Sequence, residues 1–343
     1  MLSHFAFAAN AVFPILILIL LGYLLRRFSF FNDEFLKICN KLVFYVLLPA
    51  MLFMSLYHVE SISNIDWKAV LYTGGVIVFL FFAGIAIVAI FIRDRRQKGV
   101  VLQAVFRSNT ALIGLPLAQA LGGETGVALA SVMSILAIPL FNILGVLALS
   151  MYIGGEEEGP GEKQKIRWGQ VFFKIVTNPL IIAIALGIIF LLLRAVIPKT
   201  DAGMPVFSFR NNLSWVYDAV EMISKTATPI ALVVLGGNFR FEAVPGMKRQ
   251  IIVGTAARLL LAPAIGLGCA VWLGHIGVLT LSAGHFAAMT SVFASPCAVA
   301  SAVMAAQMDN DEQLATQLVV WTCTVSVLTV FLTVVLLRVL GFL

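Results

Sequence analysis

The chain has 343 residues, of which 61% are hydrophobic and only 12% are charged, and its mean hydropathy is +1.01. Soluble globular domains carry about 25% charged residues, so this composition excludes a soluble domain and indicates an all-α protein that crosses a membrane several times. The net charge of +6 predicts no nucleic-acid partner, because the basic residues flank apolar segments and form no basic face. The four cysteines are scattered without metal-ligand spacing, so we predict no metal site.

Apolar segments long enough to cross the ~30 Å hydrocarbon core recur along the whole chain. The first is too long for the apolar core of a signal peptide and is followed by Arg26 and Arg27, so we predict a retained helix. In chain order the predicted membrane spans number ten: 5–25, 36–57, 69–92, 100–122, 126–150, 170–193, 216–236, 250–272, 279–306 and 313–337.

The distribution of Lys and Arg predicts the orientation of these spans. When the N-terminus is placed outside, most basic residues, including the run from Arg93 to Lys98, lie in loops on the cytoplasmic side. We therefore predict a multi-pass protein of the cell membrane with both termini extracytoplasmic. The Gly-rich and charged stretch 151–169 is typical of a flexible linker. It divides the chain into 1–150 and 170–343.

The two halves show signs of an internal repeat. "PILILILLGYLL" from Pro14 is similar to "PLIIAIALGIIF" from Pro179. Two further proline pairs, each with the same sequence separation, occupy matched spans: Pro49 with Pro229, and Pro116 with Pro296. The alternative to a repeat is that the prolines match by chance, because membrane helices commonly contain prolines. A five-span unit has an odd number of crossings, so its second copy would be inverted, an architecture of secondary transporters.

The fourth and ninth spans carry polar residues and helix breakers, in "RSNTALIGLPLAQ" and "FASPCAVAS". We predict that each span is two half-helices, the second beginning at Pro116 or Pro296 near the middle of the membrane. Their N-termini would present positive dipole ends to one cavity and bind an anion there. Simple structural kinks are the alternative. The candidate substrate-binding residues are Asn109, Thr110, Gly114, Pro116, Ser291, Ser295 and Pro296.

Five titratable residues are candidates for gating or coupling. Arg107 and Arg258 lie close enough to the span ends to snorkel to the surface, or to act as gates. Glu221 and Lys225 have the i,i+4 spacing of an ion pair, and His285 is the one deep candidate for proton coupling or, alternatively, a packing residue. The sequence leaves Na⁺ or H⁺ open as a coupling ion, with carbonyls near Gly114 or Ala294 as sodium ligands, and predicts no cofactor.

Five segments together resemble the auxin efflux carrier family: "NKLVFYVLLPAMLF", "FRSNTALIGLPL", "NPLIIAIALGIIF", "TPIALVVLGGNF" and "SPCAVASAVMAAQ". The similarity covers nearly the whole chain. It implies ten helices in two inverted five-helix repeats, with helices 4 and 9 crossing at Pro116 and Pro296 and with Asn109 as the crossover asparagine. Met289 stands opposite Asn109 where an amide would complete a symmetric pair. The resemblance also implies a scaffold of helices 1, 2, 6 and 7, often dimeric, beside a moving domain of helices 3–5 and 8–10.

Members of that family carry auxin in plants or small carboxylates such as malate or malonate in bacteria. This chain lacks the long central hydrophilic loop of many plant members, so we expect a carrier of a small organic anion. A sodium-coupled bile-acid-type symporter is the nearest alternative, and should show more polar cation ligands. An enzyme is disfavoured because H-E-x-x-H and G-x-S-x-G are absent, and a channel because no selectivity-filter segment is repeated.

Overall fold

The computed structural model describes residues 2–58, 66–153, 168–197 and 208–343. These ranges are helical apart from short links and one isolated β-bridge. The helices before the central linker are α1 (Leu2–Arg27), α2 (Asp33–Leu42), η1 (Val43–Leu47), α3 (Leu48–Tyr57), α4 (Trp67–Phe91), α5 (Arg95–Phe106), η2 (Thr110–Gly114) and α6 (Leu115–Met151). Those after it are α7 (Trp168–Val176), α8 (Pro179–Val196), α9 (Phe209–Asn212), α10 (Ser214–Asn238), η3 (Phe241–Ala243), α11 (Val244–Ala256), η4 (Ala257–Leu261), α12 (Ala262–His275), α13 (Ala283–Phe293), α14 (Ala300–Gln307) and α15 (Glu312–Val339).

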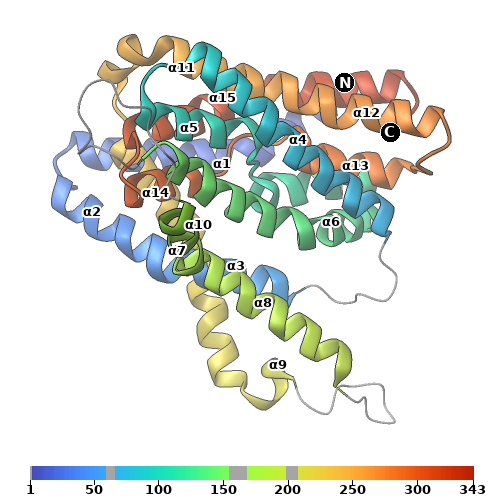
Figure 1. The fold of residues 1–343 in the computed structure, drawn as a ribbon, viewed down its shortest axis with the longest axis horizontal. Helices are drawn as coiled ribbons and strands as arrows, with labels where there is room; N and C mark the ends of the chain where they lie inside the picture. Colours follow the sequence, from blue (N-terminus) through green and yellow to red (C-terminus); the bar gives the residue numbers. More distant parts are fainter. Residues whose placement is uncertain (1, 59–65, 154–167, 198–207) are drawn as a thin grey trace.

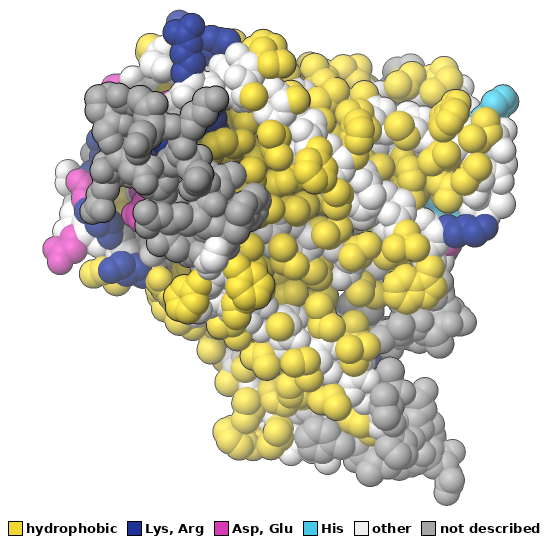
Figure 2. Space-filling view, viewed as in Figure 1, with side chains coloured by type: hydrophobic (Ala, Val, Ile, Leu, Met, Phe, Trp, Pro, Cys, Tyr) yellow, Lys and Arg dark blue, Asp and Glu magenta, His cyan; other side chains and the backbone are white. Residues whose placement is uncertain are grey.

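Six helical segments of the described residues are long and apolar enough to cross a membrane. They are Asp33–Tyr57, Trp67–Phe91, Leu112–Met151, Ser214–Asn238, Phe241–His275 and Glu312–Val339. Figure 2 shows hydrophobic side chains over the middle of one face, with most of the visible charged side chains gathered at its left end. The prediction of an all-α, multi-pass membrane protein is therefore confirmed.

Several of the spans predicted from the sequence consist of helices that are shorter than these six segments. The apolar helix Pro179–Arg194 is shorter than the six, and α5, α13 and α14 are separate pieces of the predicted fourth and ninth spans. The predicted boundary between the fourth and fifth spans falls inside α6, at Gly123, which has φ 58° and ψ −148°. This positive φ favours glycine, and two helical parts of α6 meet across a kink at this residue.

Helices from the two halves of the chain pack in two pairs, α1 along α10 and α3 along α8. In Figure 1, α3, α8 and α10 form the lower part of the molecule, and α9 lies at its lower end. Helices α4, α5 and α6 pack on one another, while α11 and α14 pack on α15. Contacts of α11 and α15 with α5 join these two groups, and α13 packs along α6.

The contact between α1 and α10 brings their backbones together at glycines. A Cβ built on Gly236 would lie 1.9 Å from the carbonyl oxygen of Ile19, and one on Gly22 would lie 2.0 Å from that of Val233. Small residues at such interfaces let the backbones of membrane helices approach closely. This close packing holds the helices together, because lipid tails are as apolar as the helices and no hydrophobic force drives the association. The α1–α10 pair therefore depends on these glycines.

We expect Gly236→Ala to lower the free energy of unfolding by about 1–3 kcal/mol or more, because the added methyl must push two backbones apart. Gly75→Ala in α4 is the matched control, since a Cβ there meets no atom within 4 Å. Thermal unfolding of both variants in detergent measures the difference. Equal midpoints would contradict the close backbone contact.

Three wide helical turns each precede a proline. In a regular α-helix the proline ring clashes with the carbonyl four residues earlier, and a π-helical turn relieves that clash by shifting the hydrogen-bond register. The turns and their prolines are Val43–Leu47 with Pro49, Thr110–Gly114 with Pro116, and Ala257–Leu261 with Pro263. These prolines are accommodated within helices and do not interrupt them.

Candidate functional site

Two interruptions of the helical structure are bonded to each other in the interior. One is the segment Arg107–Asn109 between α5 and η2, and the other is the link 294–299 between α13 and α14. Ser108 and Cys297 form an isolated antiparallel β-bridge. The backbone N–H of Asn109 donates to the carbonyl oxygen of Pro296 at 2.8 Å. Each interruption thus supplies hydrogen-bond partners that the other has lost by leaving the helix.

The helices that follow the interruptions do not begin at the predicted prolines. The first begins at Thr110, so Pro116 lies inside helical structure, and the second begins at Ala300, after Pro296. Both spans are interrupted, as predicted, but the second helix begins four residues after Pro296, and the helical structure that leads into α6, whose first turn holds Pro116, already begins at Thr110. The π-helical turn accommodates Pro116, and Pro296 remains in the link, where its carbonyl accepts the N–H of Asn109.

Arg258 from η4 is completely buried and lies at the ends of two half-helices. Its guanidinium donates to five carbonyl oxygens: Val105 (3.4 Å) and Phe106 (3.0 Å) at the end of α5, Val292 (3.0 Å) and Phe293 (2.6 Å) at the end of α13, and Ser295 (3.0 Å) in the link that follows. The last carbonyls of a helix have no partner within it and form its negative dipole end. The expectation that Arg258 snorkels to the surface is wrong, because these carbonyls hold the side chain inside.

We expect Arg258→Gln to lower the free energy of unfolding by ~3 kcal/mol or more, because several buried carbonyls lose their donors at ~1–3 kcal/mol each. Arg249→Gln is the control on α11, where the side chain is exposed and stacks near Phe91, and should change stability by ~0.5 kcal/mol at most. Chemical or thermal unfolding in detergent tests this. A mild effect at Arg258 would show that the carbonyls find other partners.

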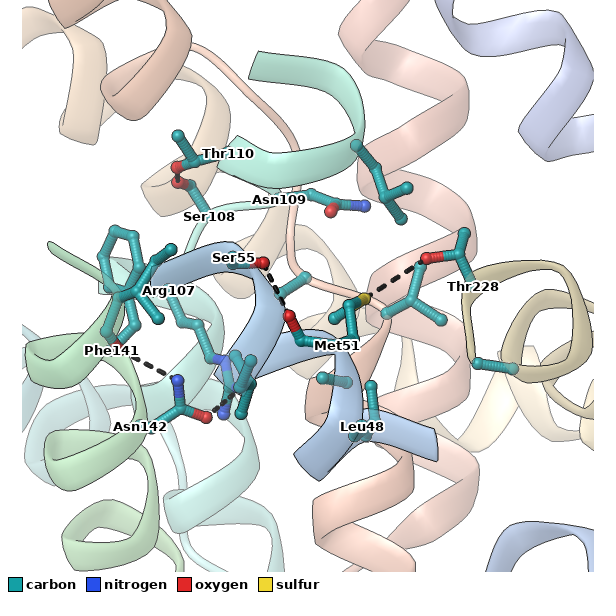
Figure 3. Close-up of a pocket in the computed structure, with 17 residues that line it drawn as sticks. Leu48, Met51, Ser55, Arg107, Ser108, Asn109, Thr110, Phe141, Asn142 and Thr228 are labelled. Atoms are coloured by element: carbon teal, nitrogen blue, oxygen red, sulfur yellow. Dashed lines mark hydrogen bonds between the residues drawn. The ribbon is translucent and has the colours of Figure 1, made fainter. Parts of the chain in front are cut away.

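Two adjacent cavities adjoin the paired interruptions. The inner one has a volume of about 70 Å³ and the outer one about 530 Å³, and both are lined by Met51, Ser55, Leu112, Ile138 and Thr228. The inner cavity also reaches Arg107, Ser108, Asn109, Thr110 and Asn142. The outer cavity reaches His58, Ser131, Ser134, Ser224 and Lys225. Figure 3 shows residues that line the inner cavity, among them Arg107, Ser108 and Asn109 from the interruption and Leu48, Met51 and Ser55 from α3.

Arg107 is buried in the wall of the inner cavity, with only 3% of its surface exposed. Its Nη2 donates to Asn142 Oδ1 at 2.9 Å, and its Nη1 contacts the sulfur of Met304. Figure 3 shows the side chain directed toward Asn142 on α6. The expectation that Arg107 snorkels to the cytoplasmic surface is therefore wrong, since the backbone of the interruption places it inside the protein.

Asn109 and Thr110 also line the inner cavity. The Nδ2 of Asn109 is buried and has no hydrogen-bond partner among the residues that the structure describes. The Thr110 hydroxyl lies 2.6 Å from that of Ser108. An unpartnered buried amide is unusual and calls for a ligand or water.

The other predicted substrate-binding residues lie behind the cavity wall. A Cβ built on Gly114 would lie 2.6 Å from the carbonyl oxygen of Ser291, so this glycine lets η2 approach α13. The Ser291 and Ser295 hydroxyls donate to carbonyls of their own chain segment, Ala288 at 2.7 Å and Ser291 at 2.6 Å. Neither proline, Pro116 nor Pro296, lines either of the two cavities.

The remaining charged candidates lie nearer the surface. Glu221 and Lys225 form an i,i+4 ion pair at 3.2 Å, as their spacing predicted, and Lys225 reaches the outer cavity. His285 is not deep, because it lies in the first turn of α13, where it forms a capping box with Ser282. Its Nε2 is 3.1 Å from Asp66 Oδ2 at the start of α4.

Several cavity residues were not predicted from the sequence. Ser55, Asn142 and Thr228 are polar residues within predominantly apolar spans, and such residues commonly face a protein interior; that was the available signal. His58 at the end of α3 also lines the outer cavity, with its Nε2 2.9 Å from the Tyr217 hydroxyl. Burial lowers the pKa of His58 below its ordinary value, and neighbouring Arg and Lys residues add to this against the opposing charge of Glu221.

The described ranges contain no group of three or more His, Cys, Asp or Glu side chains able to hold a metal ion. The polar groups that line the inner cavity are a guanidinium, amides and hydroxyls, which bind anionic or polar organic molecules.

Residues 7–334 match the model of a family described as membrane transport protein. The chain belongs to this family, that of the auxin efflux carriers. An uncharacterized transporter of Methanothermobacter thermautotrophicus is 24% identical over 90% of this chain and 91% of its own length. An uncharacterized transporter of Methanocaldococcus jannaschii is 25% identical over 74% of this chain and 76% of its own. Membership of this transport family favours transport over catalysis as the role of the cavities.

Proposed function

We propose that the protein is a secondary carrier that moves small organic anions, such as malate, malonate or other carboxylates, across the cell membrane. The observation that carries this proposal is the unpartnered Nδ2 of Asn109, buried against the inner cavity where two helix interruptions meet. A buried donor without a partner favours an acceptor that enters the cavity. A carboxylate supplies such an acceptor and binds more strongly than a neutral one.

The helix that begins at Thr110 adds to this preference. Thr110 lines the inner cavity, so the N-terminal end of this helix lies at the cavity wall. The first N–H groups of a helix lack partners within it and carry a partial positive charge. This arrangement favours an anion, as at the interrupted helices of other secondary transporters.

The proposed mechanism is alternating access by an elevator movement. In this proposal ten spans form two inverted repeats, 1–150 and 170–343, joined by the linker 151–169, of which 154–167 lie outside the described residues. The pairing of α1 with α10 and of α3 with α8 supports it, because an inverted repeat would relate these pairs. We propose these four helices as the scaffold, within a homodimer, and the remaining spans as the moving domain, with both termini extracytoplasmic.

An auxin (indole-acetate) efflux carrier and a sodium-coupled bile-acid-type symporter remain as alternatives. Arg258 disfavours the second. Its guanidinium donates hydrogen bonds to five carbonyl oxygens of α5, α13 and the link after α13. Carbonyls of interrupted helices are the ligands that sodium uses in coupled carriers. A cation tethered to the protein thus occupies this position.

We expect purified protein in liposomes to take up malate or malonate with saturable kinetics. Asn109→Ala should weaken substrate affinity about 10- to 100-fold, the scale of a hydrogen bond to a charged group, and the double change with Pro116→Ala should abolish uptake. Asn211→Ala, at an exposed position on α9, is the control. Unchanged affinity and rate in the Asn109 and Pro116 variants would contradict the proposed site.

We also expect uptake to continue when choline replaces sodium on both sides of the membrane, because Arg258 occupies the carbonyl cluster. Collapse of the pH gradient in the same vesicles then tests coupling to protons. Uptake that requires sodium would favour the symporter alternative.

A further inference from the structure

The two buried arginines differ in how their charges are compensated. Arg258 donates to five carbonyl oxygens. Within the part of the chain that the structure describes, the Arg107 guanidinium has two acceptors, the amide oxygen of Asn142 and the sulfur of Met304, and a thioether is a weak acceptor. The ion pairs found within the described ranges do not include Arg107.

A buried charge without a counter-ion is costly, by several kcal/mol even after the protein relaxes. The guanidinium also has more N–H donors than its two acceptors use. An anion in the inner cavity would satisfy both needs at once. Arg258 has no such need, because the carbonyls around it are already in place.

The surroundings of Arg107 hold the guanidinium beside the cavity. Asn142 Oδ1 accepts from Nη2, while the Asn142 Nδ2 donates to the carbonyl of Ile138 at 2.8 Å and so fixes the amide. On the other side, Gly145 provides the space: a Cβ there would lie 2.9 Å from Arg107 Nη1. These neighbours restrict the side chain to one place.

We infer that Arg107 is the cation that binds the carboxylate of the transported anion, with Asn142 and Gly145 as positioning residues. Arg107 and the unpartnered amide of Asn109 line the same cavity, and a guanidinium binds a carboxylate through two parallel hydrogen bonds. The inference rests on the proposed function and deepens it.

This assignment defines the substrate class by its charge. Among the described residues that line the inner cavity, Arg107 is the one cation outside an ion pair, whereas Lys225 in the outer cavity is paired with Glu221 at 3.2 Å. One carboxylate of the substrate is therefore neutralised, and the rest of the molecule extends toward the outer cavity. Monocarboxylates and dicarboxylates should both bind, and the corresponding uncharged amides should not.

Asn142→Asp is the sharpest test, because it places a carboxylate where an amide oxygen now lies 2.9 Å from the Arg107 Nη2. This residue would pair the buried guanidinium from within and compete with the substrate. We expect the ligand-free variant to unfold at a higher temperature than the wild type and to bind butyrate and malonate about 10- to 100-fold more weakly. Asn211→Asp on α9 makes the same charge change at an exposed position and should leave binding unchanged.

Arg107→Lys and Gly145→Ala give independent readouts. Lysine at position 107 keeps the charge but loses the planar pair of donors. The methyl group added at position 145 displaces the guanidinium. We expect each variant to bind butyrate about tenfold more weakly. Butyramide should shift the unfolding temperature of no variant. These two variants decide the question if Asn142→Asp does not fold.

The outcomes separate the two proposals. If the wild-type protein neither binds nor transports butyrate, malonate or malate, the proposed function fails. If the wild type transports them and the folded Asn142→Asp, Arg107→Lys and Gly145→Ala variants bind with wild-type affinity, the function stands and the assignment of Arg107 is overturned.

Discussion

The contact between the two helix interruptions is the interaction on which the rest of this structure depends. In a lipid environment every backbone polar group must find its partner within the protein. The Ser108–Cys297 bridge and the bond from Asn109 to Pro296 provide some of these partners, and the Arg258 guanidinium provides others at the ends of α5 and α13. Without both, two open helix ends would face the membrane interior.

This solution also creates the candidate site. Because the backbone leaves the helical conformation at 107–109, the side chains of this segment line a cavity and do not continue a helical face. The buried Arg258 donates to backbone carbonyls, whereas the buried Arg107 has more N–H donors than its acceptors use and lies beside the cavity. Arg258 thus stabilises the closed backbone, whereas Arg107 is the arginine that we propose to bind the ligand, a difference that residue type alone does not reveal.

Much of the fold followed from composition and pattern. Long apolar runs predicted a multi-pass helical protein, and the polar groups of "RSNTALIGLP" indicated an irregular fourth span. The structure of the site differs from the prediction in its details, because the positions of Pro116 and His285 depend on local geometry. A π-helical turn accommodates the proline, and a capping interaction with Ser282 places the histidine at a helix start.

Hydropathy and the distributed motifs were enough to predict a helical membrane protein of a transport family, because both are properties of residues that are neighbours in the chain. Which polar residues meet depends instead on tertiary contacts. Asn142 and Met304 lie far from Arg107 in the chain, yet both contact its guanidinium, and the carbonyls around Arg258 come from two separate helices. The burial and partners of a charge depend on such distant contacts, and these decide whether a charge stabilises the fold or remains available to a ligand.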